Sequence, residues 1–228
     1  MLGIVLALVT LCSTLYIVLV SISGSGGFNL LEFFQLKSGT EISEDKMVLK
    51  DYQKINKDVH IIISFTDRKL PVVQSKDNED YVHKNYKKEY DKYGTPMIDY
   101  TSSASADNII INAHSSSKSD VMFTPFKNKD YILANKTYNV ETVDGNKTVQ
   151  LVSYFLVDLS ADDADLSWLQ TNWRNSSEMS RYIDSVITKS EIDFNINISE
   201  VEQIVTLVTC DLSKDNARFI LVGVISGQ

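Results

Sequence analysis

An uncharged run of 21 residues at positions 2–22 is the feature that most constrains how this chain can fold. A transmembrane helix needs about 20 apolar residues to cross the hydrocarbon core of a bilayer, and its backbone groups bond internally. The alternative is a cleaved secretory signal, but the run exceeds the roughly 7–15 residues of a signal's apolar region. The sequence therefore predicts an uncleaved anchor over residues 1–22. Either interpretation puts the protein at a membrane or beyond it.

The charge balance and the cysteine content exclude several classes of protein. The chain has 22 basic and 30 acidic residues and a formal net charge of −8, which argues against a binder of nucleic acid because such a protein needs a basic face. Two cysteines are too few for a disulfide-stapled scaffold. The 228 residues suit one domain of roughly 150–200 residues plus a small additional segment.

The residues that follow the anchor begin with a flexible Gly/Ser segment and a predicted helix. We expect residues 23–42 to form a juxtamembrane linker, since they start with the sequence SGSGG. Ser43 can cap a helix that runs through Asn56, on which Val48, Tyr52 and Ile55 form one apolar face.

From residue 59 the pattern changes to β-branched and aromatic runs separated by polar turns, which is typical of strands. The predicted strands cover residues 60–65, 70–73, 108–113, 148–160, 203–209 and 218–225. One helix is predicted at 176–189, where apolar residues recur at helical spacing after a cap at Ser176 or Ser177. Because alternating strand and helix units are absent, the sequence predicts a mostly β domain with one late helix.

Cys210 is the only cysteine outside the predicted anchor, and it stands where an apolar strand gives way to a polar loop. A lone thiol in an exported domain is either buried and inert, linked to another chain, or reactive. Buried cysteines are the commoner case, whereas a strand end that opens onto a loop is typical of catalytic groups.

A reactive cysteine needs a base or a cation and a donor for a developing oxyanion, and His114 and Arg218 are the candidates. His114 follows an apolar strand, as Cys210 does, whereas His60 and His83 are more typical of structural or solvated histidines. Arg218 opens the strand after Cys210, so a hairpin would bring the two to one end of the sheet. The alternative for Arg218 is a surface ion pair with Asp211 or Asp215.

The segment TLVTC at 206–210, with an arginine at the start of the last strand, resembles the TLxTC signature of sortases, the cysteine transpeptidases of Gram-positive cell surfaces. Class B is the most similar, because four further features occur in its order. These are LPVVQSKDNEDYV at 70–82, GTPMIDY at 94–100, NIIINAHSSSKSDVMFTPF at 108–126 and the amphipathic helix before TLVTC. The resemblance covers about residues 43–226.

Three positions depart from the class B pattern. The sequence NAHS at 112–115 stands where class B enzymes usually read YGHN, Val208 stands where Ser is common, and HI at 60–61 replaces a G-W pair. None of these changes removes a catalytic residue, so they bear on the substrate motif more than on the chemistry.

The resemblance implies a closed eight-stranded sortase-type β-barrel with N-terminal helices and a helical insertion before the strand of the catalytic cysteine. It implies a catalytic domain over residues 43–228, outside the cell membrane, held by a single-pass anchor. Cys210, His114 and Arg218 would be catalytic, Asn78, Val82 and Thr209 would bind substrate, and the chemistry needs no metal or cofactor.

The implied reaction cleaves a C-terminal sorting signal after Thr through a thioester on Cys210 and transfers the protein to an amine. The implied partners are surface proteins that carry the signal, and either a lipid II-like cell-wall precursor or a pilin lysine. The main alternative is a membrane-tethered β-barrel binding module with a packed Cys210. A thiol redox protein is disfavoured because the chain has no CxxC motif.

Overall fold

The computed structural model describes residues 43–118, 120–196, 198 and 200–227. The predicted anchor at 1–22 and linker at 23–42 lie outside these residues, so both stay predictions, as does the predicted domain start at residue 43. In the described part, no helix has the length and apolar character needed to cross a bilayer. The residues Met47–Gln228 form one compact unit, and the fold below is that of this unit.

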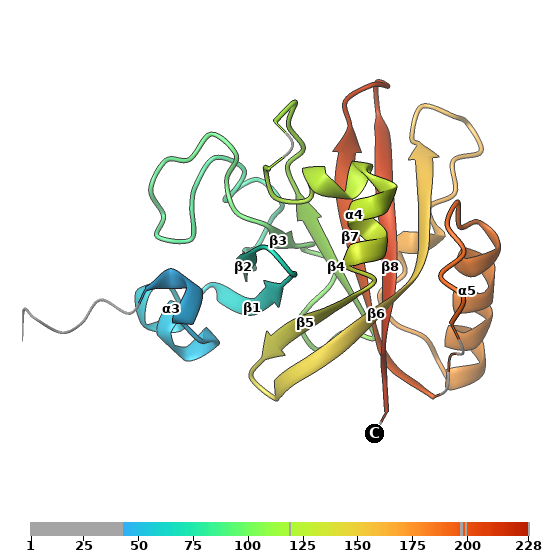
Figure 1. The fold of residues 1–228 in the computed structure, drawn as a ribbon, viewed down its shortest axis with the longest axis horizontal. Helices are drawn as coiled ribbons and strands as arrows, with labels where there is room; N and C mark the ends of the chain where they lie inside the picture. The colour runs from blue at the N-terminus through green and yellow to red at the C-terminus, as the bar shows by residue number, and fades with distance from the viewer. Residues whose placement is uncertain (1–42, 119, 197, 199, 228) are drawn as a thin grey trace, which may run out of the picture. The chain divides into compact units, whose positions relative to one another are not determined.

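Eight strands of the described chain close into a barrel in the order β1-β2-β3-β4-β7-β8-β6-β5 (Figure 1). Their bounds are β1 Val59–Ser64, β2 Lys69–Val73, β3 Met97–Ile98, β4 Asn108–Ala113, β5 Thr137–Thr142, β6 Gly145–Asp158, β7 Val201–Asp211 and β8 Ala217–Ser226. The β2–β3 and β4–β7 pairs are parallel, whereas the remaining pairs are antiparallel. The predicted fold class is confirmed.

The apolar runs of β4, β7 and β8 are continuous because both faces of these strands are buried. Side chains of a strand alternate between its two faces. Ile109 and Ile111 therefore pack into one core cluster with Val205 and Leu207, while Ile110 packs into a second cluster on the other face.

Helix α5 (Ser176–Thr188) covers part of that second face and lies beside β6 (Figure 1). Its buried side chains are those expected from the helical spacing: Met179, Tyr182, Ile183 and Val186. The helix was expected to be capped by Ser176 or Ser177, but that expectation is wrong. Asn175 is the N-cap, because its side chain accepts the backbone N–H of Glu178.

The bounds predicted for the first helix, from Ser43 to Asn56, are wrong. A 3-10 turn, η1 (Glu44–Lys46), precedes a separate helix α3 (Leu49–Ile55), whose N-cap is Val48 in an extended conformation. Tyr52 is buried as expected, but Val48 and Ile55 are about half exposed, and Leu49 is buried in their place.

Strand β5 and helix α4 (Lys129–Ala134) were not predicted. β5 is a short strand whose buried residues Tyr138, Val140 and Thr142 alternate with less buried ones. It is held by antiparallel pairing with β1 on one side and β6 on the other. The local sequence of its six residues does not predict these contacts. Two short 3-10 turns complete the fold: η2 (Thr124–Lys127) and η3 (Ser167–Leu169).

Candidate active site

A pocket of about 300 Å³ lies at the ends of β4, β7 and β8, where the loop between β2 and β3 faces them. All six predicted site residues line it: Asn78, Val82, His114, Thr209, Cys210 and Arg218. Six further residues line it as well: Thr95, Met97, Asp99, Asn112, Ala113 and Val208. The structure therefore brings together residues that are up to 140 positions apart in the chain, from Asn78 to Arg218.

Cys210 and Arg218 are direct partners in the antiparallel pairing of β7 with β8. The predicted hairpin is confirmed, and it fixes both side chains at the same end of the sheet. Cys210 is a free, partly exposed thiol that lines the pocket, so it is not the buried cysteine of the alternative interpretation.

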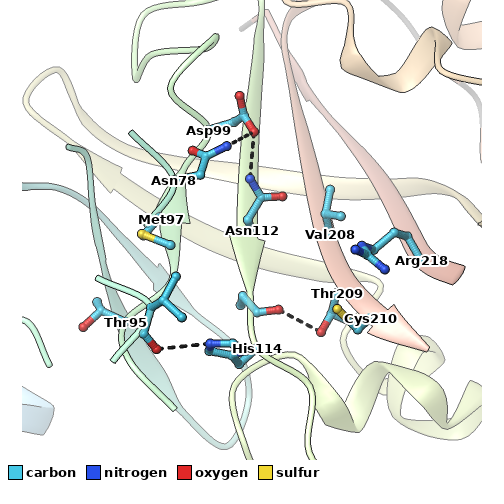
Figure 2. Close-up of a pocket in the computed structure, with 12 residues that line it drawn as sticks. Asn78, Thr95, Met97, Asp99, Asn112, His114, Val208, Thr209, Cys210 and Arg218 are labelled. Atoms are coloured by element: carbon cyan, nitrogen blue, oxygen red, sulfur yellow. Dashed lines mark hydrogen bonds between the residues drawn. The ribbon is translucent and has the colours of Figure 1, made fainter. Parts of the chain in front are cut away.

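Arg218 makes no ion pair with a carboxylate in the described chain, so the predicted alternative of a bond to Asp211 or Asp215 is not observed. Its Nη1 donates to the carbonyl of the neighbouring Ala217 at 3.0 Å, and its guanidinium is directed toward Val208 (Figure 2). The carboxylate of Asp211 instead accepts hydrogen bonds from Ser213. The guanidinium thus keeps most of its donors for a bound substrate.

His114 reaches the same pocket because β4 runs parallel to β7, with Ala113 opposite Thr209. The residues that follow this pair are His114 and Cys210, so both strands deliver a functional side chain at the same end. The hydroxyl of Thr209 donates to the carbonyl of Ala113 at 2.9 Å. Thr209 is 2% exposed, so its main observed contact is with β4 rather than with the pocket interior.

The imidazole of His114 is held by the loop that faces β4. Its Nε2 donates to the carbonyl of Val82 at 3.1 Å, and in Figure 2 the ring is directed away from Cys210. The ring of His83 stacks on it, with centroids 5.9 Å apart and an interplanar angle of 13°. His83 is exposed, as expected, but no local feature of the sequence indicates that it lies against His114.

The loop that carries Asn78 and Val82 is anchored by Tyr81, which is fully buried. The Tyr81 hydroxyl donates to Asp58 at 2.5 Å and accepts from Asn56 at 2.7 Å. Burial and the hydrogen bond to Asp58 together raise the pKa of Tyr81, so it stays a neutral donor. Tyr81 therefore holds the loop from which Asn78 and Val82, two of the three predicted substrate-binding residues, reach the pocket.

Asp99 is a pocket residue that the sequence analysis missed. It is 7% exposed and accepts hydrogen bonds from the side chains of Asn78, Asn112 and Thr101. Burial acts to raise the pKa of this carboxyl, but the hydrogen bonds from Thr101, Asn112 and Asn78 outweigh burial and hold it below its ordinary value. Asp99 is therefore ionised at neutral pH.

No group of three or more His, Cys, Asp or Glu side chains suited to a metal ion occurs in the part of the chain that the structure describes. Cys210, His114 and Arg218 make no hydrogen bond to one another in that part. A thiol, an imidazole and a guanidinium at one pocket can supply a nucleophile, a proton carrier and a donor for an oxyanion.

No protein-family model matches the chain. The chain does match a known protein, sortase B of Listeria monocytogenes, with 30% identity over 184 residues. The overlap covers 77% of this chain and 72% of that protein.

Solved structures agree in fold. A sortase B–substrate complex from Staphylococcus aureus has a TM-score of 0.67 and 22% identity, with 78% of this chain and 83% of that chain covered. A sortase B complexed with triglycine has a TM-score of 0.66 and 22% identity, with 77% and 84% covered.

Proposed function

The chain belongs to the class B sortases, which are cysteine transpeptidases, and from this premise we propose that it cleaves a C-terminal sorting signal after Thr and transfers the cleaved protein to an amine. The observation that carries the proposal is that Cys210, His114 and Arg218 line one pocket. These three side chains have the chemistry that acyl transfer through a thioester requires.

In the first half of the proposed reaction, the Cys210 thiolate attacks the carbonyl carbon of the Thr residue of the signal. A carbon–sulfur bond forms and the carbonyl oxygen becomes an oxyanion. When the oxyanion collapses, the peptide C–N bond breaks and His114 gives a proton to the leaving amine. The products are a thioester on Cys210 and the released C-terminal peptide.

In the second half, the nitrogen of an acceptor amine attacks the thioester carbonyl and loses a proton to His114. The new C–N bond forms as the C–S bond breaks, and the cysteine leaves as a thiolate. His114 ends each cycle with the proton that it needs for the next one, so the reaction requires no external acid, base or oxidant.

Arg218 is proposed to bind the oxyanion or the backbone of the signal. Its register position opposite Cys210 and the absence of a carboxylate partner in the described chain support this role. A guanidinium is always charged and offers a planar set of donors, which suits a carbonyl oxygen that gains negative charge.

The proposed substrates are surface proteins that carry a sorting signal. The proposed acceptor is the amine of a cell-wall precursor cross-bridge or of a pilin lysine. The relatives solved with a substrate and with triglycine support peptide and amine ligands for this chain as well. Asn78 and Val82 line the pocket and are proposed to contact the signal.

We further propose that residues 1–22 anchor the chain in the cell membrane and that the barrel lies on the outer side. The support is the uncharged 21-residue run at 2–22 together with the nature of the proposed substrates. The alternative, a tethered binding module, would leave Cys210 as a packing residue, and the partial exposure of this thiol speaks against it.

The test is incubation of the full chain, in detergent, with fluorogenic peptides of the NPQTN, LPxTG and SPKTG types, followed by mass spectrometry of the trapped thioester. We expect cleavage of at least one peptide and an acyl adduct on Cys210. A Cys12→Ser variant is the matched control, since it removes the only other thiol. Cleavage that survives Cys210→Ala, or an adduct that disappears with Cys12→Ser, would overturn the proposal.

A further inference from the structure

Two consecutive residues of the loop between β2 and β3 hold the imidazole of His114 from two directions. The carbonyl of Val82 accepts the Nε2–H of His114 at 3.1 Å, which is a contact with the edge of the ring. The ring of His83 lies against its face, with centroids 5.9 Å apart and planes 13° from parallel. This geometry is that of an offset aromatic stack. The bond restrains the ring within its plane, and the stack restrains it perpendicular to that plane.

The position of His83 is itself fixed, although its side chain is exposed. Its Nδ1 donates to the carbonyl of Lys92 at 3.2 Å, and its backbone carbonyl accepts the N–H of Asp91 at 3.0 Å. An isolated β-bridge joins the next residue, Lys84, to Tyr90. The two arms of the loop are therefore paired at the point where His83 meets His114, so the ring can serve as a support.

The bond to Val82 also determines which nitrogen of His114 is available for proton transfer. A carbonyl oxygen only accepts, so Nε2 carries the hydrogen that this bond needs. Nδ1 of His114 makes no hydrogen bond within the described part of the chain, and it is the nitrogen that can hold or lose the second proton. Because a tilt of the ring displaces Nδ1, a ring held at both its edge and its face keeps this atom in one place.

His83 lies next to the pocket of Cys210 without lining it. That pocket is lined by His114 and Val82, among others. His83 instead lines a separate outer pocket, together with Tyr90 and charged side chains of the same loop. Any effect of His83 on the reaction therefore passes through His114.

We propose that His83 is a positioning residue whose ring, together with the Val82 carbonyl, fixes the plane of the His114 imidazole, so that Nδ1 meets the leaving amine and the attacking amine in one orientation. His83 does not exchange the proton itself. An aromatic ring at position 83 is then sufficient, and the nitrogens of His83 are dispensable. This inference rests on the proposed function, because it names the residue that supports the proton carrier of the same site.

Two replacements of His83 separate its ring from its hydrogen bond. His83→Phe keeps an aromatic face and removes the bond to Lys92, whereas His83→Gln removes the ring and keeps a donor for that carbonyl. In cleavage of a fluorogenic peptide by the full chain, His83→Gln should lower kcat by about tenfold, the upper end of what one ring pair contributes. Its KM should change by less than about twofold, and His83→Phe should keep kcat within about twofold of the wild type.

Tyr90→Leu is the matched control. Tyr90 is another ring of the same loop, 82% exposed, with its centroid 6.4 Å from that of His83, and it makes no ring contact with His114 in the described chain. Its replacement removes an aromatic side chain from the loop and leaves the stack on His114, so this variant should keep the wild-type kcat. A loss as large as that of His83→Gln would show that any change in the loop slows the reaction, and would overturn the role of His83.

A second measurement does not depend on turnover. The chain has three histidines, so labelling with 13C-histidine gives ring signals from His60, His83 and His114 alone. The NMR order parameter of the His114 ring should fall in His83→Gln and keep its wild-type value in His83→Phe and in Tyr90→Leu. His60, which lies on β1, is the internal reference.

The outcomes separate this inference from the proposed function. A wild-type kcat in His83→Gln, or an equal loss in His83→Phe and His83→Gln, overturns the inference and leaves the transpeptidase proposal standing. If the full chain cleaves no peptide but the order parameter falls as expected, the proposed reaction is wrong and the support of His114 by His83 is confirmed. If neither cleavage nor a fall in the order parameter is observed, both are wrong. If His83→Gln fails to fold, His83→Leu, which also lacks a ring, takes its place in both measurements.

Discussion

The hydroxyl of Thr209 donates a hydrogen bond of 2.9 Å to the carbonyl of Ala113, which joins the two strand ends directly before Cys210 and His114. Each partner precedes one of the two proposed reacting groups. The bond therefore fixes how far the β7 end and the β4 end can separate at the pocket, in addition to the backbone pairing of these strands.

Replacing Thr209 by Val keeps the shape of the side chain but removes this bond. We expect the free energy of unfolding to fall by about 1 kcal/mol, because the part-buried carbonyl of Ala113 loses its donor. We also expect kcat to fall by about tenfold or more, since small misplacements of reacting groups are costly. Urea unfolding and cleavage of a fluorogenic peptide measure the two effects.

Thr206→Val is the matched control. Thr206 is also a buried threonine of β7, three residues before Thr209 and further from the pocket, and it donates to the side chain of Asn108 on β4 at 2.8 Å. Its replacement should destabilise the fold by a similar amount without a comparable loss of kcat. Equal loss of turnover in both variants would show that the Thr209 bond acts through stability alone.

Arg218 is expected to act in the transition state rather than in folding. Arg218→Ala should lower kcat by about a hundredfold, because a donor to the developing oxyanion is lost. Arg218→Lys should retain more kcat than Arg218→Ala but less than the wild type, since an ammonium cannot reproduce the planar set of donors. Arg181→Ala, an exposed arginine of α5, controls for the loss of charge. Full activity of Arg218→Lys would contradict a role that depends on the guanidinium geometry.

Much of the barrel could be predicted because its strands carry strong local signals. β4, β7 and β8 are long runs of β-branched residues, and α5 has a clear helical period. β5 was not predicted because its six residues mix polar and apolar side chains, and they form a strand only through pairing with β1 and β6. The cap of α5 was predicted one or two residues too late because Asn175, Ser176 and Ser177 are all good capping residues, and only the geometry chooses among them.

Some residues of the site could likewise be predicted from local sequence, and others could not. The Cys210–Arg218 pairing follows from one hairpin, and the place of His114 at the end of an apolar strand indicated its role. Asp99 could not be found from local sequence, since it acts through hydrogen bonds to residues 21 positions before it and 13 positions after it. The stacking of His83 on His114 likewise depends on how the loop folds back on β4.

The ionised Asp99 should make the stability of the fold depend on pH. Its folded pKa is held below the ordinary value of 3.8 by the donors around it. Its stabilising contribution is therefore present above the unfolded pKa and is lost as the pH falls through the folded pKa. The free-energy difference between the wild type and Asp99→Asn should be larger at about pH 6 than at about pH 3.

Urea unfolding at the two pH values measures this difference. Asp162→Asn, on the exposed surface, is the control for the loss of one carboxyl. A wild-type advantage over Asp99→Asn that stays constant over this range would mean that the charge of Asp99 does not contribute, and that only the shape of the side chain matters.

Gly94 is expected to control the carbonyl that holds His114. It has a φ of +67°, and a Cβ at this position would lie 2.2 Å from the carbonyl oxygen of Tyr81 and 2.4 Å from that of Val82. Gly94→Ala must therefore displace the Val82 carbonyl, which accepts the Nε2–H of His114. We expect a loss of stability of about 1–2 kcal/mol from the left-handed backbone and a fall in kcat from the displaced imidazole.

Gly145→Ala separates these two effects. Gly145 also has a positive φ, +111°, but a Cβ there meets nothing within 4 Å, and it lies in the β5–β6 hairpin rather than at the pocket. This variant should lose stability through backbone strain and keep its kcat, whereas Gly94→Ala should lose both. If Gly94→Ala keeps the wild-type kcat at a temperature where it is fully folded, the Val82 carbonyl does not set the catalytic position of His114.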